Sequence, residues 1–427
     1  MPTFSRYQKF VIAVLVFLQF TTILDFMILA PLGAMLLTDL GITTAQFGLA
    51  VSAYAFSAGI AGVLTAGFAD KFDRKRLLLF FYSGFVLGTL LCALANSFHF
   101  LLMARIVTGV FGGVTGSIGF AIITDLFPLQ VRGRVMGLVQ TAFAAAQVMG
   151  LPLGLYLANH WSWHAPFFMI AGVGAAVGVV LAAALRPINE HLKNPSTRNP
   201  LQHLFKTVSR GRYVRVFAAT MLLSTGGFML MPFGSAFTVH NMGIALAQLP
   251  AIYMVTGLSS IVSGPLMGRL SDAIGKYPTF CLGTFLGMVI VGIYCNLGIT
   301  PLPWVMAINV ALFVAIMARM ISSSTLTSAI PDPQDRGAFM AINVSISQLA
   351  GGVASWVAGQ IVVQAPDGRI LHYDTLGWVV IGAMLLTVAM MYPIDRAVKA
   401  SIAAAAAAGG PASGLPVGQP PGRSAPR

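Results

Sequence analysis

The sequence predicts an all-α integral membrane protein with twelve transmembrane helices in two pseudo-symmetric six-helix bundles. Apolar residues make up 57% of the 427 residues and charged residues only 9%, against about 25% charged in a typical soluble protein. The apolar residues gather in runs close to the roughly 20 residues that cross a bilayer. A charged stretch also occurs twice, around Asp70 and around Asp272, and a repeat at half-length is typical of two-fold membrane proteins.

The apolar runs place the twelve helices in order along the chain. Each run is interpreted as a helix because backbone groups in lipid must bond within their own segment. The short alternating strands of a transmembrane barrel are absent from the sequence. The predicted spans are 10–35, 46–68, 77–95, 99–123, 136–158, 166–185, 214–239, 248–267, 279–297, 304–328, 338–363 and 376–394.

The repeat divides the chain into two halves. Residues 1–185 are predicted to form the N-terminal bundle and residues 214–397 the C-terminal bundle. The linker 186–213 contains three prolines and a concentration of basic residues. The tail 398–427 is expected to be a disordered cytoplasmic segment. Within it, residues 403–408 are all alanine and can extend the last helix a short way, and the remainder, 409–427, is rich in Gly and Pro.

The net charge of +13 is distributed as in a membrane protein. With an even number of spans both termini share one side, and that side carries 22 of the 25 lysines and arginines, whereas the opposite loops hold only Arg369. This positive-inside pattern predicts cytoplasmic termini and a bacterial-type inner membrane, with the lipid bilayer as partner. A nucleic-acid-binding surface would need clustered charge on a soluble face, so no nucleic acid partner is expected.

The sequence gives no sign of an enzyme. No nucleotide-binding loop is present, so ATP is not expected to drive the protein. The histidines are scattered, and Cys92, Cys281 and Cys295 lie inside apolar runs, where small packing residues are common. No catalytic residue, metal site or organic cofactor is therefore expected.

A second repeat supports an internal duplication. Residues 128–137 and 332–341 share a Gln, an Arg-Gly pair and a Met at an offset of 204. The charged stretch around Asp272 then resembles the loop signature G-x-L-a-D-r-x-G-r-k of the major facilitator superfamily. The matching positions are Gly268, Leu270, Asp272, Gly275 and Lys276, and the first copy keeps Asp70, Arg74 and Lys75 but has Ala66 and Asp73 at the glycine positions. The resemblance covers nearly the whole chain and implies the major facilitator fold and a monomer.

Two further motifs resemble those of drug:proton antiporters within that superfamily. Arg105 and Gly109 match the R-x-x-x-G motif of the fourth helix, and Gly150, Pro152 and Gly154 match the G-x-P-x-G variant of the antiporter motif of the fifth helix. This variant is similar to that of arabinose, sugar and purine efflux permeases. The resemblance implies export of a small molecule in exchange for protons, with the proton gradient as the energy source.

Asp25 is the key ionisable residue of the predicted spans. A charged acid inside the membrane costs several kcal/mol unless it faces a cavity or a partner. Arg105 is the expected partner, because Asp25 lies about 13 Å from the outer end of its helix and Arg105 about 9 Å from the same side. Burial and a nearby guanidinium act oppositely on the proton affinity of a carboxyl, so the two are predicted to couple transport to protons. The alternative is a fixed structural ion pair, or separate polar contacts.

The charged loops predict a conformational latch. Asp70 can accept bonds from a helix N-terminus and pair with Arg74 or Arg132, which would hold the inner ends of the helices together. The alternative is that these charges only anchor the loops on one side. The predicted latch set is Asp70, Arg74, Lys75, Arg132, Asp272, Lys276 and Arg336.

Two sets of residues are assigned to helix contact and to the substrate path. Gly150, Pro152 and Gly154 allow close approach and a local bend, either for gating or for packing alone. The candidate cavity residues are Gln19, Thr22, Phe26, Tyr54, Thr108, Gln140, Ser224, Phe228, Tyr253, Asn309, Asn343 and Gln348, each of which can equally be a packing or interhelical residue. Arg319 is expected to snorkel to the surface or to bond between helices, or else to attract an anionic group.

Three functions remain open from the sequence. The favoured one is a proton-coupled antiporter that exports a small molecule by alternating access. The second is a proton-coupled or facilitative uptake permease for a metabolite, since one fold serves both. The third is a membrane sensor without transport, which is disfavoured because no loop is long enough to form a soluble domain.

Overall fold

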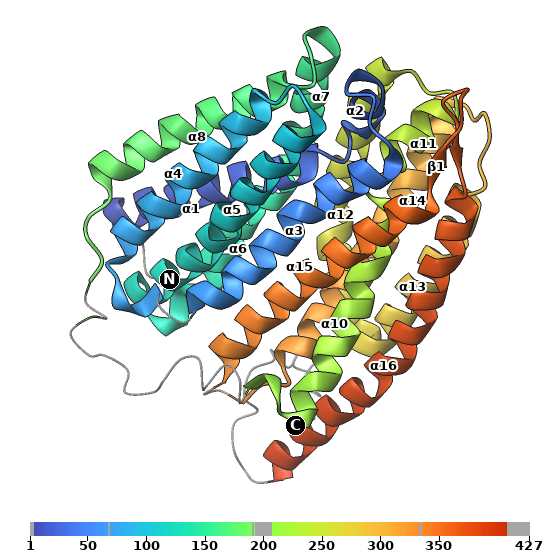
Figure 1. Ribbon diagram of the computed structural model, residues 1–427. Helices are drawn as coiled ribbons and strands as arrows, with labels where there is room; N and C mark the ends of the chain where they lie inside the picture. The colour runs from blue at the N-terminus through green and yellow to red at the C-terminus, as the bar shows by residue number, and fades with distance from the viewer. Residues whose placement is uncertain (1–3, 67–68, 190–191, 193–206, 333–334, 408–427) are drawn as a thin grey trace, which may run out of the picture.

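The structure is a computed structural model that describes residues 4–66, 69–189, 192, 207–332 and 335–407. Within these residues, twelve helices are long and apolar enough to cross a membrane, which confirms the predicted number. Figure 1 shows them as two groups, blue to green for the first half and yellow to red for the second. The chain is therefore a multi-pass membrane protein.

The N-terminal half contains six spans and two short elements. They are α1 (Arg6–Ile28), α2 (Gly33–Asp39), α3 (Thr44–Ala66), η1 (Ala69–Lys71), α4 (Arg74–Ala93), α5 (Phe98–Leu126), the continuous run α6 (Leu129–Ala145), η2 (Ala146–Gly150) and α7 (Leu151–His160), and α8 (Ala165–Ala184).

The C-terminal half repeats this order and adds a small hairpin. Its elements are α10 (Gly211–Leu230), α11 (Gly234–His240), η4 (Leu246–Gln248), α12 (Leu249–Ile274), α13 (Lys276–Tyr294), α14 (Leu302–Ser328), α15 (Arg336–Ile361), β1 (Val363–Gln364), β2 (Ile370–Leu371) and α16 (Tyr373–Ala407). Strands β1 and β2 are antiparallel, with Val363 opposite Leu371.

Polar side chains begin several of these helices where the apolar runs start. The Ser5 hydroxyl accepts a hydrogen bond from the Gln8 amide, and the Gln8 side chain accepts one from the Ser5 amide. Asp73 caps α4 at the Arg76 amide, and Ser97 caps α5. These bonds satisfy amides that the first helical turn leaves unpaired.

The two sides of the helix bundle differ in what they carry. We call the side with Arg6 and Arg186 the terminus side, because an even number of spans returns the chain there. We call the opposite side, which carries α2, α11 and the β1–β2 hairpin, the far side (Figure 1).

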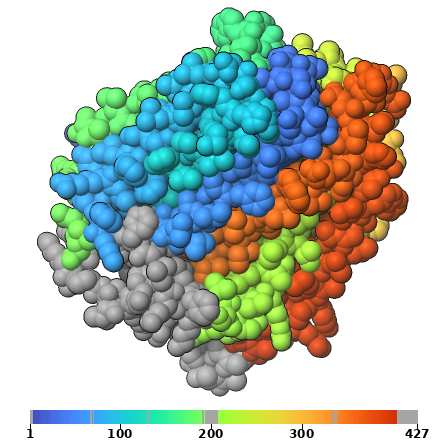
Figure 2. Space-filling view, viewed as in Figure 1, coloured from blue at the N-terminus to red at the C-terminus, as the bar shows by residue number. Residues whose placement is uncertain are grey.

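The two halves meet along two helix pairs. Helix α3 packs against α15, and α12 packs against α7 and η2. Each pair joins the second or fifth span of one half to the fifth or second span of the other, so the contacts follow the pseudo-two-fold symmetry. Figure 2 shows the boundary on one face, where the blue surface of the first half adjoins the orange surface of the second.

The first span of each half is broken at a proline. The sequence predicts one helix over 10–35, whereas α1 ends at Ile28 and α2 begins at Gly33. Pro31 explains the break, because proline lacks the amide donor and its ring clashes with the preceding turn. In the second half Pro232 lies in the corresponding break between α10 and α11.

The boundaries of the predicted linker and tail differ from the observed helices. Helix α10 begins at Gly211, inside the predicted linker 186–213, and residues 193–206 of that linker lie outside the described residues. Helix α16 extends to Ala407, so residues 398–407 of the predicted tail are helical, and the alanine run extends the last helix as the sequence allows. Alanine is the best helix former, which accounts for this extension. The remainder of the tail, 408–427, lies outside the description.

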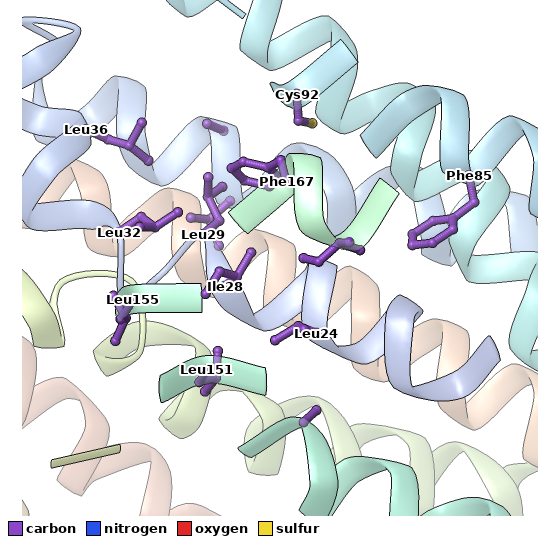
Figure 3. Close-up of a cluster of buried hydrophobic side chains, with 14 of the residues drawn as sticks. Leu24, Ile28, Leu29, Leu32, Leu36, Phe85, Cys92, Leu151, Leu155 and Phe167 are labelled. Carbon is purple, nitrogen blue, oxygen red and sulfur yellow. The ribbon is translucent and has the colours of Figure 1, made fainter. Parts of the chain in front are cut away.

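The apolar core places α1 at the centre of its half. Leu24 and Ile28 of α1 are at most 1% exposed and belong to the same buried cluster as Leu151 and Leu155 of α7. Figure 3 shows these side chains converging from the two helices, with Phe167 of α8 beside them. This packing fixes the height and rotation of α1, and therefore of Asp25 on it.

Candidate functional site

A buried ion pair joins the first and fourth spans. Nη1 of Arg105 on α5 lies 2.8 Å from Oδ2 of Asp25 on α1, and it also donates to the Asp25 carbonyl oxygen at 3.2 Å. The Asp25 side chain is 0% exposed and that of Arg105 is 1% exposed. The two residues thus pair as the sequence predicts, and neither charge reaches solvent in this conformation.

Helix α4 completes the surroundings of the carboxylate. The Thr89 hydroxyl donates to Oδ1 of Asp25 at 3.0 Å. One turn further along α4, Sγ of Cys92 lies 3.6 Å from the Thr108 hydroxyl. Gly88 permits this contact, because a Cβ there would lie 2.9 Å from the Thr108 amide nitrogen. Both carboxylate oxygens of Asp25 are therefore hydrogen-bonded, as buried charges require.

Close packing of α5 on α3 places a tyrosine face under Arg105. The Arg105 Cζ lies 4.6 Å from the centre of the Tyr54 ring, a distance at which a cation and an aromatic face attract. Gly109, the glycine of the R-x-x-x-G motif, makes the approach possible. A Cβ at this position would lie 2.5 Å from the Tyr54 carbonyl oxygen and would also collide with the Ser57 hydroxyl.

A row of aromatic rings links the ion pair to the other half. Tyr54 contacts Phe26 of α1 with ring centres 5.2 Å apart, and Phe26 contacts Phe228 of α10 at 5.8 Å. A Cβ on Gly351 of α15 would lie 2.6 Å from the Phe228 ring. A rearrangement at Arg105 is therefore two rings away from the interface between the halves.

Each charge of the pair depends on the other for its stabilisation. Removing one partner from a buried ion pair costs about 3–5 kcal/mol, because the other charge is left uncompensated. Nε of Arg105 is also buried without a hydrogen-bond partner. The guanidinium is thus held by Asp25 and the Tyr54 face, and it depends on the charge of one carboxylate.

The predicted antiporter motif packs directly against α1 beside Asp25. A Cβ on Gly150 would lie 2.7 Å from Leu24 Cδ1, and a Cβ on Gly154 would lie 2.7 Å from Ile28 Cδ1. Pro152 follows the π-helical turn η2 within the continuous run of α6, η2 and α7, where its missing amide removes one helical hydrogen bond and favours a local change of helix geometry. The motif therefore sets how closely α7 approaches the helix that carries the acid.

The fifth span widens into a π-helical turn that ends at Gly150, the first residue of this motif. The turn, η2, contacts α12 of the other half: a Cβ on Gly257 would lie 3.0 Å from the Gln147 carbonyl oxygen, and Ser260 donates to Gln147 Oε1 at 3.2 Å. Such turns occur frequently at functional sites, and this one lies where the two halves meet.

The residues of the predicted latch make bonds inside their own halves. Arg74 donates to Asp125 Oδ2 at 3.0 Å, and Lys75 donates to the Ala182 carbonyl oxygen at 2.9 Å. Arg132 donates to the carbonyl oxygens of Thr124 and Phe127.

In the second copy of the loop, Lys276 pairs with Asp272, whose side chain is 73% exposed. The side chains of Asp70 and Arg336 lie outside the described residues. The latch therefore stays a prediction.

Several predicted cavity residues form hydrogen bonds within or between helices with their polar side chains. Thr220 donates to Asn343 at 2.8 Å and Ser224 bonds Ser347 at 2.7 Å, which joins α10 to α15. Thr22, Thr108 and Asn309 donate to carbonyl oxygens one turn earlier in their own helices.

Other predicted cavity residues make no side-chain hydrogen bond within the described residues. Gln140 is exposed, whereas Gln348 and Tyr253 are half-buried. Gln19 borders a small hollow between α1, α5 and α6. Which of the twelve candidates contact a substrate stays a prediction.

Sequence reasoning missed Thr89 and Asp125. Thr89 follows Gly88 within an apolar span, and a small residue beside a hydroxyl in a membrane helix is a signal of close helix contact. Asp125 lies two residues beyond the fourth predicted span, 99–123, and is an acid in a chain with few acids. Both are recognisable only once Asp25 and Arg74 have been placed opposite them.

Arg319 on α14 presents another buried guanidinium. It is 6% exposed, its Cζ lies 5.7 Å from the Phe280 ring, and its Nε is buried without a partner. Within the described residues its side chain makes no ion pair or hydrogen bond, so it is neither snorkelled to the surface nor bonded between helices.

The described residues contain no group of three His, Cys, Asp or Glu side chains placed to hold a metal ion.

Comparison with known proteins agrees with this architecture. The chain is 30% identical over 265 residues to the uncharacterised MFS-type transporter YceJ of Bacillus subtilis, covering 61% of this chain and 67% of that protein. It is 26% identical to a probable sugar efflux transporter of Helicobacter pylori over 63% of this chain and 68% of that one. Two further curated relatives are matched over 58% and 62% of their own lengths.

Among solved structures, the nucleoside transporter NupG superposes with a TM-score of 0.72, covering 90% of this chain and 98% of that chain at 15% identity. At that identity the likeness concerns the fold alone. A model of the Major Facilitator Superfamily matches residues 15–355, most of the chain. With twelve spans in two related halves and the family's sequence pattern across both, this protein belongs to the Major Facilitator Superfamily.

Proposed function

We propose that this transporter exports a small molecule in exchange for protons, by alternating access between its two halves. The observation that carries the proposal is the buried pair of Asp25 and Arg105, 2.8 Å apart, in a membrane-spanning core. Intramembrane acids commonly serve proton relays, and this acid is bonded to groups that respond to its charge.

Proton binding at Asp25 would release Arg105. The neutral carboxyl still offers an oxygen to Thr89, but it no longer compensates the guanidinium. An uncompensated buried charge costs about 3–5 kcal/mol. Shifting a two-state equilibrium from 1:99 to 99:1 takes about 5.5 kcal/mol. The free-energy change on binding one proton is therefore most of what a switch between two conformations needs.

The row of aromatic rings connects Arg105 by direct packing to the interface between the halves. Movement of Arg105 removes support from the Tyr54 face, which packs on Phe26 and through it on Phe228 of the second half. We infer that protonation changes the packing of α1 against α10 and thereby the balance between conformations.

Besides the bond from Ser260 to Gln147 at η2, three hydrogen bonds between the halves indicate which side is closed in this conformation. Thr44 donates to the Val362 carbonyl oxygen, Ser235 to that of Ala30, and Asn159 to that of Leu246. All three bonds lie toward the far side. We infer that the substrate path opens to the terminus side here, which in the predicted orientation is the cytoplasm.

An uncharged polar molecule suits the site best as a substrate. Because Arg105 already compensates Asp25, the pair offers no net charge to a cationic drug. Relatives named as probable sugar efflux transporters favour sugars as the first class to test. An uptake permease is the alternative, and the same assay separates the two by the direction of proton movement.

The test uses inverted membrane vesicles with an acidic interior that is reported by a pH-sensitive dye. Arabinose, a thiogalactoside, uridine and ethidium are added in turn to wild type, Asp25→Asn and Asp39→Asn. Asp39 is an exposed acid on α2, so its variant removes the same charge outside the pair. Proton release on addition of a sugar, retained in Asp39→Asn and lost in Asp25→Asn, supports the proposal.

Two outcomes contradict it. Accumulation of substrate against a gradient by Asp25→Asn would show that Asp25 is not the coupling group. Substrate movement only down its own gradient, with no proton release in wild type, would identify a facilitative permease.

A further inference from the structure

A basic cleft opens at the terminus side of the second half, away from the ion pair. It has a volume of about 170 Å³ and lies between the first turn of α10, the last part of α16 and the segment after α14. Arg212 and Arg215 line it together with the apolar side chains of Val216, Ile330 and Ile394. A cleft with two guanidinium groups and an apolar floor suits an amphipathic anion.

The charges around the cleft leave one arginine uncompensated. Asp332 accepts a hydrogen bond from Arg210 at 3.1 Å and lies 3.7 Å from Arg212. Arg210 also pairs with Asp335. The exposed Arg215 makes no side-chain ion pair or hydrogen bond within the described residues, and Asp332 is shared between two arginines.

The neighbouring end of α16 adds little negative charge. Asp395 pairs with Lys399 at 2.7 Å, and the Arg396 guanidinium stacks over the Tyr392 ring. The region around the cleft thus holds five basic side chains against three carboxylates. The surplus is positive and lies at the cleft.

Deeper in the span than the cleft, α10 and α16 expose apolar side chains. Met221 of α10 is 48% exposed, and Leu385 and Leu386 of α16 are 55% and 59% exposed. Met221 lies six residues deeper than Arg215, about 9 Å along the helix axis. In a membrane-spanning chain such exposed side chains face acyl chains, so the basic cleft lies at the depth of lipid headgroups.

We propose that this cleft binds the phosphate headgroup of an anionic phospholipid, with the acyl chains lying along α10 and α16. Arginine pairs with phosphate in a two-pronged geometry and is weakly hydrated, which suits it to this role. Basic pockets between membrane helices bind anionic headgroups. The lipid would brace α10, the first helix of the moving C-terminal half, against α16.

Inorganic phosphate has the same charged group as a phospholipid headgroup but lacks the apolar part of the lipid. The floor of Val216, Ile330 and Ile394 gives a free phosphate ion nothing to bind, whereas it accommodates the glycerol and upper acyl carbons of a lipid. The lipid is therefore the better occupant.

The experiment is native mass spectrometry of the purified transporter with phosphatidylglycerol or phosphatidylcholine, supported by melting curves with each lipid. We expect wild type to retain phosphatidylglycerol selectively and to melt at a higher temperature with it. The double variant Arg212→Gln with Arg215→Gln should bind it about 30-fold more weakly, since each basic residue near the membrane surface contributes about fivefold.

Two further variants separate the cleft from general charge. Ala397→Phe fills the cleft without changing charge and should also lose selective binding. Arg269→Gln removes an exposed arginine at the terminus-side end of α12, outside the cleft, and should bind like wild type.

The proposal is overturned if the double variant binds as wild type does, or if Arg269→Gln loses as much binding. Displacement of the lipid by millimolar inorganic phosphate would assign the cleft to a soluble anion instead. None of these readouts requires transport, so the result stands apart from proton coupling.

Discussion

Two arginines lie deep inside membrane spans of this protein, in opposite circumstances. Arg105 has a carboxylate, a carbonyl oxygen and a tyrosine face. The Cζ atom of Arg319 lies 5.7 Å from the centre of the Phe280 ring, and within the described residues its side chain makes no hydrogen bond. The contrast lets the energetic role of each guanidinium be tested by the same substitution.

Arg105→Met should destabilise the protein by about 3–5 kcal/mol, because it leaves the Asp25 carboxylate buried without its partner. Adding Asp25→Leu should restore most of that loss, since apolar pairs replace buried ion pairs with little net cost. Thermal unfolding in detergent compares the single and double variants. Additive losses in the double variant would mean that the two charges are not coupled.

Arg319→Met should be neutral or stabilising, because it removes a buried charge and breaks no described hydrogen bond. The same melting assay measures it beside Arg105→Met. A loss as large as that of Arg105→Met would reveal a partner that stabilises Arg319 in solution.

At the scale of elements, glycines decide which helices touch. Gly109 brings α5 onto α3 and thereby sets Arg105 over Tyr54, and Gly88 brings α4 onto α5 beside Thr89. The first span of each half breaks at Pro31 or Pro232, and the two breaks adjoin: a Cβ on Gly33 would lie 3.1 Å from the Pro232 carbonyl oxygen. The site is therefore positioned by backbone approach as much as by side-chain bonds.

Gly109→Ala should lower stability by about 1–3 kcal/mol, the usual range for overpacking, because the new methyl group collides with the α3 backbone. Gly133→Ala is the matched control, since nothing lies within 4 Å of a Cβ there. Melting temperature and yield of monodisperse protein are the measurements. Equal behaviour of the two variants would contradict the described contact between α3 and α5.

The membrane spans could be predicted from the sequence because their length and apolarity are properties of each segment alone. The ion pair could also be predicted, because an acid and an arginine inside apolar runs must find partners. Prediction failed for the α1 break, whose position depends on how Pro31 packs, and for the π turn at Ala146–Gly150. Thr89 was missed because only tertiary contact distinguishes it from other hydroxyls in the spans.

At the scale of the whole molecule, the far side joins the two halves through three hydrogen bonds between described residues. One of them runs from Asn159 at the end of α7 to Leu246 in η4. Alternating access requires these contacts to separate in every cycle, which makes their immobilisation a direct test of the proposed motion.

Asn159→Cys with Leu246→Cys, joined by a short bifunctional thiol reagent, should stop efflux, and reduction should restore it. The native Cys92, Cys281 and Cys295 are first replaced by alanine or serine. The measurement is substrate efflux from vesicles before and after reduction.

The matched control is Asn241→Cys with Leu371→Cys, a cross-link inside the second half on the same side. It should leave efflux unchanged. Efflux that persists through the cross-link between the halves would mean that the far side does not open during transport.

The ion pair lies entirely within one half of the molecule, on α1, α4 and α5. About two hundred positions later, the equivalents of Asp25 and Arg105 fall near Phe228 and Asn309, which carry no charge. The first copy of the repeat thus carries this pair, and the second copy has uncharged residues at the equivalent positions. A chimera joining residues 1–185 to a relative's second half would therefore keep the ion pair intact.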